Sequence, residues 1–377
     1  SFVNFYLKPK LNFRARMIHL PFFTTIRSGR ATFLINPQLA SPAEYAPASK
    51  MPTNQTKSVL VTGIGGNVGQ GILRNIRRFY GESIRILGTD FNETTAGHFF
   101  CDEFSQLPIY SDGRYPEELK ALCVREQIDL IIPSTDGEVV AIGNHAEELP
   151  SFVGSPPSTT SMCLDKFETF ERFRKAEIPF ANSCLPSTYN NQWDHLVVKP
   201  REGRGSRNIH YLSAFAGEFN DSFVIQQRLF GAEITIAFYR TRSGNLLGPL
   251  TLARELQSGM TWKCTVSLEW SSQVNALIES VTGAFDILGP CNIQAIATTE
   301  STVIPFELNC RYSGTNSFRS HFGFSDVKYG IDEFLFNIEP EPEMITQGSA
   351  LRLAMDVVYP DTPLDQIGSG SEGALIF

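Results

Sequence analysis

Two neighbouring apolar stretches decide the fold: Asn292-Ile-Gln294-Ala-Ile and Ile304-Pro-Phe-Glu307-Leu-Asn309-Cys-Arg311. Each predicts a β-strand, and because side chains alternate along a strand, Glu307 and Asn309 point to the same face. If the strands lie side by side, Gln294 joins them and three oxygen ligands meet. Such ligands suit a hard cation such as Mg²⁺, whose shell nucleotide phosphates usually complete. Arg311 extends this face with a fork of donors for phosphate or carboxylate, so the stretch predicts the metal end of an ATP site.

The composition is that of a globular protein with more than one domain. A chain of 377 residues exceeds one ordinary hydrophobic core and predicts two or three domains. No apolar run is long enough to cross a bilayer, so we expect no membrane association. The seven cysteines are scattered and never form a CxxC pair, which argues against a disulfide framework and structural zinc and favours a reduced, cytoplasmic setting.

The N-terminal segment differs in charge from the rest of the chain. Residues 1–50 hold seven Lys/Arg residues and one acid, Glu44, whereas the whole chain has a net charge of −8. The acidic body argues against nucleic acid as a partner. We expect residues 1–56 to be a poorly ordered leader or extension. Because the segment is rich in Arg and poor in acids, a transit peptide for import into an organelle is the alternative.

From Ser58 onward the chain alternates strands and helices. Expected strands at 59–62, 84–90 and 129–133 alternate with helices at 70–80, 116–127 and 137–149, which predicts an α/β domain with a parallel, Rossmann-like sheet at 57–155. A second domain is expected at 156–345, with a small β-rich unit at about 185–225 followed by longer strands and a helix at 272–285. Residues 346–377 form a C-terminal segment.

A glycine-rich turn, Gly63-Ile-Gly-Gly-Asn-Val-Gly69, follows the first strand. Glycines there let the backbone approach a helix N-terminus or an anion, and Asp90 ends the next strand where a ribose-binding acid stands in a dinucleotide fold. The alternative is a tight turn that binds nothing or contacts a substrate. No Tyr-x-x-x-Lys pair follows, so the turn alone gives weak support for NAD binding.

Two further segments suit a nucleotide. Lys199 ends a strand and precedes the loop Pro200–Asn208, whose glycines and cations suit a lid over polyphosphate; a solvated hairpin is the alternative. Gln226–Glu233 reads as an extended hinge that could contact an adenine edge, with Glu233 accepting from ribose hydroxyls; an ordinary linker is the alternative. A last group of polar residues could bind an anionic acceptor substrate or could equally lie on the surface: Arg254, Lys263, Arg319 and the run Tyr312–Asn316.

The order of these motifs resembles the ATP-grasp superfamily, most closely its carbamoyl-phosphate-synthase-like branch. The resemblance covers about residues 58–340 and rests on Asp165-Lys166, Val198-Lys199 with its glycine loop, the Gln226–Glu233 hinge, Gln294 and Glu307-x-Asn309-x-Arg311. It implies a Rossmann-like pre-ATP-grasp domain followed by an α+β ATP-grasp domain with a small β-rich lid subdomain. In this family the N-terminal domain usually shapes the acceptor site, which favours a structural role for Gly63–Gly69.

The resemblance also implies roles for individual residues. Lys166 and Lys199 would contact phosphates, with Gly203, Gly205 and Ser206 at the lid tip. Gln226 would meet the adenine amine, the backbone of Arg228 and Leu229 the ring, and Glu233 the ribose. The residues implied for Mg²⁺, or alternatively Mn²⁺, are Gln294, Glu307 and Asn309. Catalytic roles fall to Lys199 and to Arg311, which would steady the transferred phosphoryl group or the intermediate.

The implied activity is that of a carbon–nitrogen ligase using ATP. A carboxylate is activated as an acyl phosphate and attacked by an amine, giving ADP and phosphate. The partners are then small-molecule carboxylates and amines, and a homodimer is possible. The alternatives are a kinase-like or carboxylating ATP-grasp enzyme, and a non-catalytic nucleotide-binding protein of NAD type. Gln226 stands where many ligases have Glu, and Cys310 replaces a common Pro. The chain is too short for the duplicated synthase.

Overall fold

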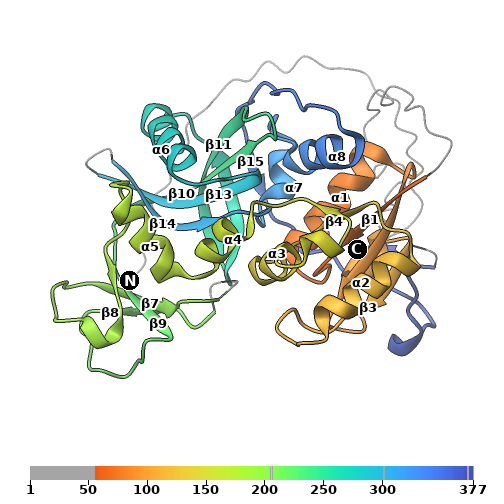
Figure 1. Ribbon diagram of the computed structural model, residues 1–377, viewed down its shortest axis with the longest axis horizontal. Coiled ribbons are helices and arrows are strands. Elements are labelled where there is room, and N and C mark those ends of the chain that lie inside the picture. The colour runs from red at the N-terminus through yellow and green to blue at the C-terminus, as the bar shows by residue number, and fades with distance from the viewer. Residues whose placement is uncertain (1–55, 204, 206, 300–301, 372, 377) are drawn as a thin grey trace, which may run out of the picture. The chain divides into compact units, whose positions relative to one another are not determined.

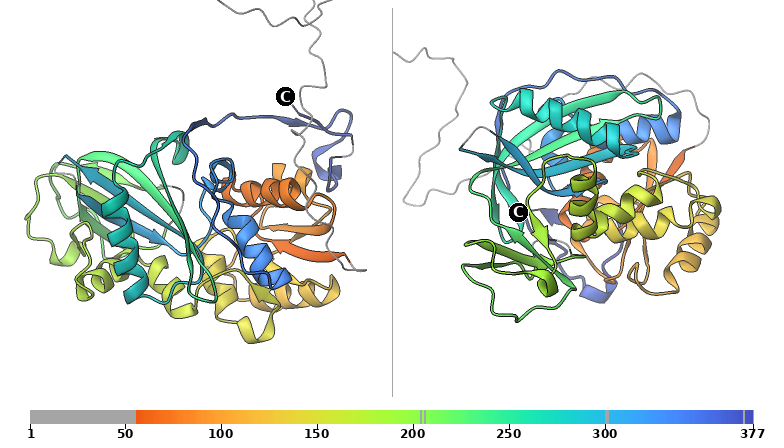
Figure 2. Two further views of the ribbon diagram at one scale, coloured as in Figure 1. Left: turned by 90° about the horizontal axis from the view of Figure 1, so that it is seen from above. Right: turned by 60° about the vertical axis from the view of Figure 1, so that its left-hand side comes forward.

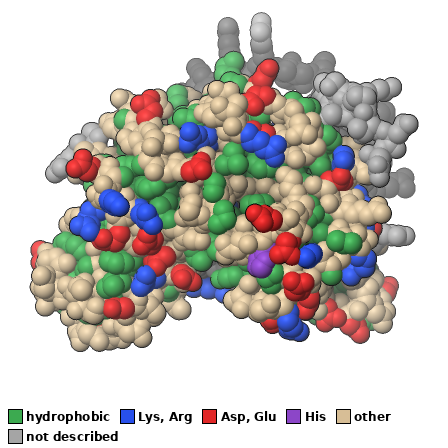
Figure 3. All heavy atoms as spheres, viewed as in Figure 1, with side chains coloured by type: hydrophobic (Ala, Val, Ile, Leu, Met, Phe, Trp, Pro, Cys, Tyr) green, Lys and Arg blue, Asp and Glu red, His purple; other side chains and the backbone are tan. Residues whose placement is uncertain are grey.

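The computed structural model describes residues 56–376, apart from 204, 206, 300, 301 and 372. The predicted leader, except its last residue, lies outside these residues. The described part contains three main sheets of five, six and four strands and a separate pair of strands. Among the described residues, none of the helices has the length and apolarity that crossing a membrane requires. On the face drawn in Figure 3, acidic and basic side chains are interspersed.

The N-terminal sheet is parallel and lies between helices (Figure 1). Its strand order is β3-β2-β1-β4-β5. Val59 and Val61 pack with Ile72 in one core, whereas Leu60, pointing the opposite way, packs with Leu119 in another. Both faces of the sheet are therefore buried, as in other parallel sheets. The elements are β1 (Lys57–Val61), α1 (Asn67–Tyr80), β2 (Ile84–Asp90), β3 (Glu103–Gln106), α2 (Tyr115–Arg125), β4 (Leu130–Ile132), α3 (Asp136–Gly143) and β5 (Ser151–Phe152).

The largest sheet carries the predicted metal strands. Its order is β14-β13-β10-β11-β12-β15, and all neighbours are antiparallel. Helix α6 covers one face, where Val274 and Val281 pack with Ile236 and Ile293. The strands are β10 (Gly231–Arg240), β11 (Leu246–Gln257), β12 (Met260–Val266), β13 (Gly289–Thr298), β14 (Val303–Asn309) and β15 (Ser349–Leu351); the helices nearby are α4 (Pro157–Leu164), α5 (Lys166–Lys175) and α6 (Ser271–Ala284).

A small antiparallel sheet forms the predicted β-rich unit. Its order is β6-β9-β7-β8, and its own core contains Leu196, Val198 and Ile225. Strand β7 ends at the glycine-rich loop, and β9 leads directly into the hinge before β10, so this sheet borders the large one. The strands are β6 (Ser183–Cys184), β7 (Leu196–Pro200), β8 (His210–Leu212) and β9 (Phe223–Gln227); β16 (Val357–Val358) pairs with β17 (Leu375–Ile376) in the C-terminal segment.

Two helices near the C-terminus join the parallel sheet to the largest one. Figure 2 shows α7 (Asn316–Arg319) and α8 (Asp326–Phe336) in blue, between the large sheet and the orange α1. The hydroxyl of Tyr80 donates to Asp332 at 2.6 Å, and the Asn316 amide donates to the Val68 carbonyl at 3.0 Å. The bond to Val68 holds the N-terminus of α1, next to the Gly63–Gly69 turn, against α7, and the bond of Tyr80 holds its C-terminus against α8.

Arg319 is a structural residue and does not grip an acceptor. Its side chain is completely buried and pairs with Asp326 at 2.7 Å. It also donates to Asn292 on β13 and to Thr315, so it fixes the turn after Arg311 against the large sheet. A buried cation of this kind needs its anion, because leaving either charge unpaired would be costly.

Candidate active site

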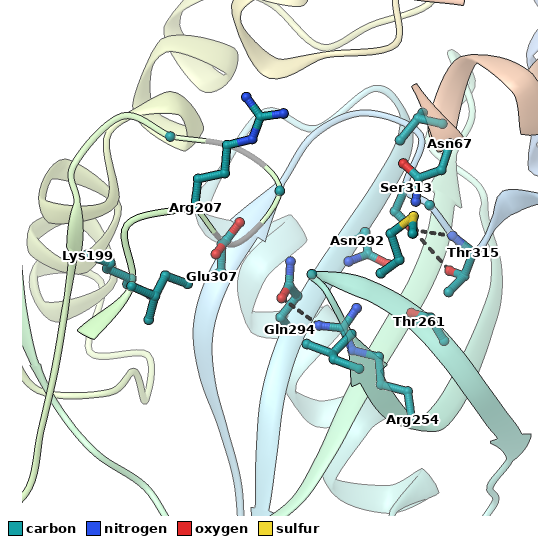
Figure 4. A pocket seen from close by; sticks show the side chains of 18 of the residues that line it. Asn67, Lys199, Arg207, Arg254, Thr261, Asn292, Gln294, Glu307, Ser313 and Thr315 are labelled. Atoms are coloured by element: carbon teal, nitrogen blue, oxygen red, sulfur yellow. Dashed lines mark hydrogen bonds between the residues drawn. The ribbon is translucent and has the colours of Figure 1, made fainter. Parts of the chain in front are cut away.

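Gln294 and Glu307 stand directly opposite each other in the antiparallel pair of β13 and β14. The ladder is interrupted by a bulge immediately after Gln294, and Asn292 is paired with Asn309. Figure 4 shows the side chains of Gln294 and Glu307 beside one space that Lys199 and Arg207 also border. The structure thus brings together a carboxylate and an amide oxygen with two cations, all lining one cavity.

The charge of Glu307 is stabilised by the cations around it. Burial acts to raise its pKa, but Lys166, Lys199 and Arg311 outweigh this effect and lower the pKa below its usual value. Lys199, which is 3% exposed, donates to the Phe306 carbonyl at 3.1 Å. Burial lowers the pKa of Lys199 to about 8, with Glu307 opposing the shift. A further anion in this cavity would therefore favour the charged form of the lysine.

Lys166 begins α5 and lies under the glycine-rich loop. Its ammonium donates to the carbonyl of Gly203 at 3.2 Å and also reaches that of Arg201. Asp165 caps the helix by accepting from the backbone of Phe167 at 2.9 Å. Gly205 has a φ of +65°, which favours glycine, whereas Ser206 lies outside the described residues.

The hinge borders a second cavity that is more apolar. It shares Lys199, Gln294 and Glu307 with the first cavity, so the two are adjacent. The amide nitrogen of Gln226 donates to Ser183 at 3.0 Å, which fixes the orientation of the amide group. The wall of this second cavity includes the apolar side chains Val197, Ile209, Leu256, Ile296 and Phe306. It also includes the predicted nucleotide contacts Gln226, Arg228, Leu229 and Glu233.

Two predicted contacts in this region already have protein partners. The backbone N–H of Arg228 donates to the His195 carbonyl at 2.9 Å, so that donor is taken. Glu233 accepts from Arg254 at 2.6 Å, and the same guanidinium donates to the Gln294 side-chain oxygen at 2.7 Å. Arg254 therefore links the residue predicted for ribose to one predicted for metal.

A third cavity, of about 530 Å³, lies over the Gly63–Gly69 turn. It shares Asn67, Arg207 and Arg311 with the first cavity. Arg311 donates to Asp136 at 2.8 Å and to Asn309 at 3.0 Å. It therefore stands at the junction between the cavity with Glu307 and the one over the turn.

The sequence did not identify Asp136 and Asn67 as site residues, although both line the cavity over the turn. Asp136 begins α3 directly after strand β4, and Asn67 begins α1 after β1. Both positions follow the carboxyl end of a parallel strand, where ligands of open α/β sheets bind, and this signal could have identified them. The partner of Asp136 is 175 residues away, so nothing local to Asp136 indicates the ion pair.

The glycine-rich turn is held by Asp90. One carboxylate oxygen of Asp90 accepts from the backbone of Gly65 at 2.8 Å, and the other accepts from Asn92. A Cβ on Gly69 would lie 2.5 Å from the Gly63 carbonyl oxygen, so the turn must be glycine at that point. These contacts supply a structural reason for both the glycines and Asp90.

The donors suit a cation that shares its shell with phosphate. Among the described residues, no cluster of three His, Cys, Asp or Glu side chains could hold a metal unaided. Glu307 and Gln294 line the cavity and offer hard oxygen donors with only one charge. Asn309 is buried outside the cavity lining, and its side-chain oxygen accepts from Arg311. Mg²⁺ is commonly held by one or two carboxylates together with phosphate oxygens. The neighbouring Lys166, Lys199 and Arg207 provide the charge that a polyphosphate would need, so the residues fit a metal–nucleotide ligand.

Comparison with known proteins agrees with this architecture. Residues 59–152 match the family model of the PylC-like N-terminal domain, and residues 163–315 match that of the ATP-grasp domain. A search of curated proteins finds no matching relative.

Solved structures with the same fold include three ligase-like enzymes. N5-carboxyaminoimidazole synthetase from Staphylococcus aureus, in complex with ADP, has a TM-score of 0.65 at 12% identity over 77% of this chain and 80% of its own. L-amino acid ligase from Bacillus licheniformis has a TM-score of 0.60 at 15% identity, and the match covers 75% of each chain. Biotin carboxylase from Campylobacter jejuni has a TM-score of 0.61 at 13% identity, and the match covers 78% of this chain and 74% of its own.

The predicted fold class is confirmed by these matches. A Rossmann-like domain precedes an ATP-grasp domain whose small four-stranded sheet corresponds to the predicted lid. The chain thus contains an ATP-grasp domain preceded by a PylC-like N-terminal domain.

Proposed function

We propose that this protein is an ATP- and Mg²⁺-dependent ligase that joins a small-molecule carboxylate to an amine, releasing ADP and phosphate. The observation that carries the proposal is the position of Glu307 and Gln294. They face each other and line both the cavity bordered by the hinge and the cavity lined by lysines and Arg311. A nucleotide placed with its base at the hinge and its phosphates at Glu307 would direct its last phosphate toward the cavity over Gly63–Gly69.

Each part of the site then has a task. Glu307, Gln294 and Asn309 would hold Mg²⁺, which would neutralise the charge of the phosphoryl group that ATP supplies to activate the carboxylate. Lys166 and Lys199 would bind phosphate oxygens, with Gly203 and Gly205 beside them. Arg311 steadies the transferred group, while Asp136 orients Arg311. Gln226, Leu229 and Glu233 position the base and ribose, together with the backbone of Arg228.

The alternatives from the sequence have unequal support. The NAD-type alternative depended on Gly63–Gly69 and Asp90, and both Asp90 oxygens are used to hold neighbouring loops. The carboxylating alternative keeps some support, because two of the structurally similar enzymes are a carboxyaminoimidazole synthetase and a biotin carboxylase.

The test is product analysis with Mg·ATP and pools of amino acids, dipeptides and small carboxylic acids. ADP and phosphate that appear only with a carboxylate and an amine would support ligation, and dividing the pool would identify the pair. Release that depends on bicarbonate would favour the carboxylating alternative. Failure to bind Mg·ATP or Mg·ADP would overturn the proposal.

The proposed setting is the cytoplasm or another reduced compartment, since all seven cysteines are free thiols. We propose that its partners are small molecules. Light scattering of the purified chain would test whether it forms a homodimer.

A further inference from the structure

Arg254 occupies two oxygens that the proposed function assigns to ligands. It lies on β11, one residue before a bulge in the pairing with β12. Its guanidinium donates twice to Glu233, at 2.6 and 3.0 Å, and once to Gln294, at 2.7 Å. The Arg254 side chain is only 10% exposed, so these contacts satisfy a charge that has little access to water.

The present arrangement conflicts with a bound metal–nucleotide ligand. A cation held by the Gln294 oxygen would lie within a few ångströms of the Arg254 guanidinium, and two positive charges at that distance repel strongly in a partly buried site. A ribose bound by Glu233 would also compete with Arg254 for the same carboxylate. Both donations to Glu233 go to one carboxylate oxygen, Oε1, so Arg254 competes with the nucleotide for that oxygen and for the side-chain oxygen of Gln294.

The cavity with Glu307 gives the released guanidinium somewhere to go. Arg254 lines it together with Thr261, Ser313 and Thr315, which lie away from Lys199 in Figure 4. Two other cations near that end already have anions: Arg311 pairs with Asp136, and Arg319 pairs with Asp326. A guanidinium that has lost Glu233 and remains largely buried needs a new anion, and its fork matches a carboxylate or phosphate.

We propose that Arg254 exchanges partners during the reaction: it pairs with Glu233 and Gln294 in the free protein, and the nucleotide displaces it so that it binds the oxyanion of the acceptor substrate. The inference rests on the proposed function. Its consequence is ordered binding, in which Mg·ADP or Mg·ATP creates the anion site that the carboxylate then uses. Arg254 is thus a specificity residue for the acceptor as well as a competitor of the nucleotide.

The test uses Arg254→Met, which keeps the length of the side chain and removes its charge. Isothermal titration measures binding of Mg·ADP, and then of inorganic phosphate as an anion probe with and without Mg·ADP. In the natural protein we expect Mg·ADP to tighten phosphate binding about fivefold or more. In the variant this coupling should vanish and Mg·ADP itself should bind several-fold more tightly, because no internal partner has to be displaced.

Other variants separate this role from a structural one. Arg254→Lys keeps the charge but lacks the planar fork of the guanidinium, so it should retain part of the coupling even if Arg254→Met folds poorly. Lys263→Met is the matched control, because Lys263 lies on the adjacent strand and pairs with the exposed Glu255; it should behave like the natural protein. Coupling that persists in a folded Arg254→Met, or Mg·ADP binding that is unchanged or weaker there, would overturn the inference, as would complete loss of coupling in Arg254→Lys. Failure of the natural protein to bind Mg·ADP would instead overturn the proposed function.

Discussion

Asp165 and Arg201 form an ion pair that ties the start of α5 to the base of the glycine-rich loop. The Arg201 Nε lies 3.1 Å from both carboxylate oxygens, while one of these oxygens also accepts from the backbone of Phe167. Burial acts to raise the pKa of Asp165, but Arg201 and the helix N–H groups outweigh it and lower the pKa. One carboxylate thus caps a helix and anchors the loop that Lys166 contacts.

We expect the two tasks of Asp165 to be separable. Asn is a good N-cap but carries no charge, so Asp165→Asn should keep the stability of α5 while releasing Arg201 and raising KM for ATP. Asp165→Ala should lose the cap as well, lowering the unfolding free energy by about 1–2 kcal/mol. Thermal unfolding and ATP kinetics on both variants provide the comparison. Equal KM values for Asp165→Asn and the natural protein would show that the ion pair does not position the loop.

Lys199 should make nucleotide binding depend on pH. Its pKa in the folded protein is lowered to about 8 by burial, against 10.5 ordinarily. The unfolded chain therefore binds more protons between these values, and the unfolding free energy should rise with pH from about 8 to 10.5. Polyphosphate favours the charged lysine, so Mg·ADP binding should take up a proton near pH 8 to 9. Affinity should fall about tenfold per pH unit above the pKa.

Titration calorimetry in buffers of different ionisation enthalpy measures that proton uptake. Lys199→Met should abolish the uptake and flatten the pH profile of the affinity. Lys120, an exposed lysine paired with Glu148, provides the control variant Lys120→Met, which should retain both. Proton uptake that survives in Lys199→Met would assign the titration to another group.

Local patterns were sufficient to place the strand pair that carries the proposed metal site. The two-residue repeat of Glu307 and Asn309 indicates one face, and the register with Gln294 follows once the strands are neighbours. The ion pair of Arg311 with Asp136 and the bonds of Arg254 depend on tertiary packing between distant segments, and local patterns do not encode such packing. Helix α4 was also missed, because Ser158-Thr-Thr-Ser161 reads as a polar linker although Thr159 and Thr160 are buried.

Replacing the acid of the proposed metal site should stop turnover. In Glu307→Gln the shape is kept, but the negative charge between Lys166 and Lys199 is lost, and kcat should fall by about 100-fold or more. The Mn²⁺ affinity of the complex with ADP, measured by electron paramagnetic resonance, should fall in parallel. Glu255→Gln removes an exposed carboxylate from β11 and should change neither quantity. Full activity of Glu307→Gln would refute the metal assignment.

The cavity over Gly63–Gly69 can be tested through Gly66, which lines it. Gly66 has an ordinary extended backbone, with φ −81° and ψ 159°. A Cβ there would meet only the Gly63 carbonyl oxygen, at 3.5 Å. Gly66→Leu should therefore fold normally and narrow the cavity. Because the proposed nucleotide lies beyond Arg311, we expect KM for the acceptor to rise about tenfold or more while Mg·ADP affinity stays the same.

Gly113→Leu is the matched control, since its Cβ would meet no atom within 4 Å and the residue borders none of the three cavities. Calorimetry gives the Mg·ADP affinity and steady-state kinetics give KM for the acceptor. If Gly66→Leu lost Mg·ADP binding while Gly113→Leu kept it, the nucleotide would have to lie over the glycine-rich turn. The acceptor would then have to bind elsewhere, and the assignment of the two cavities would be reversed.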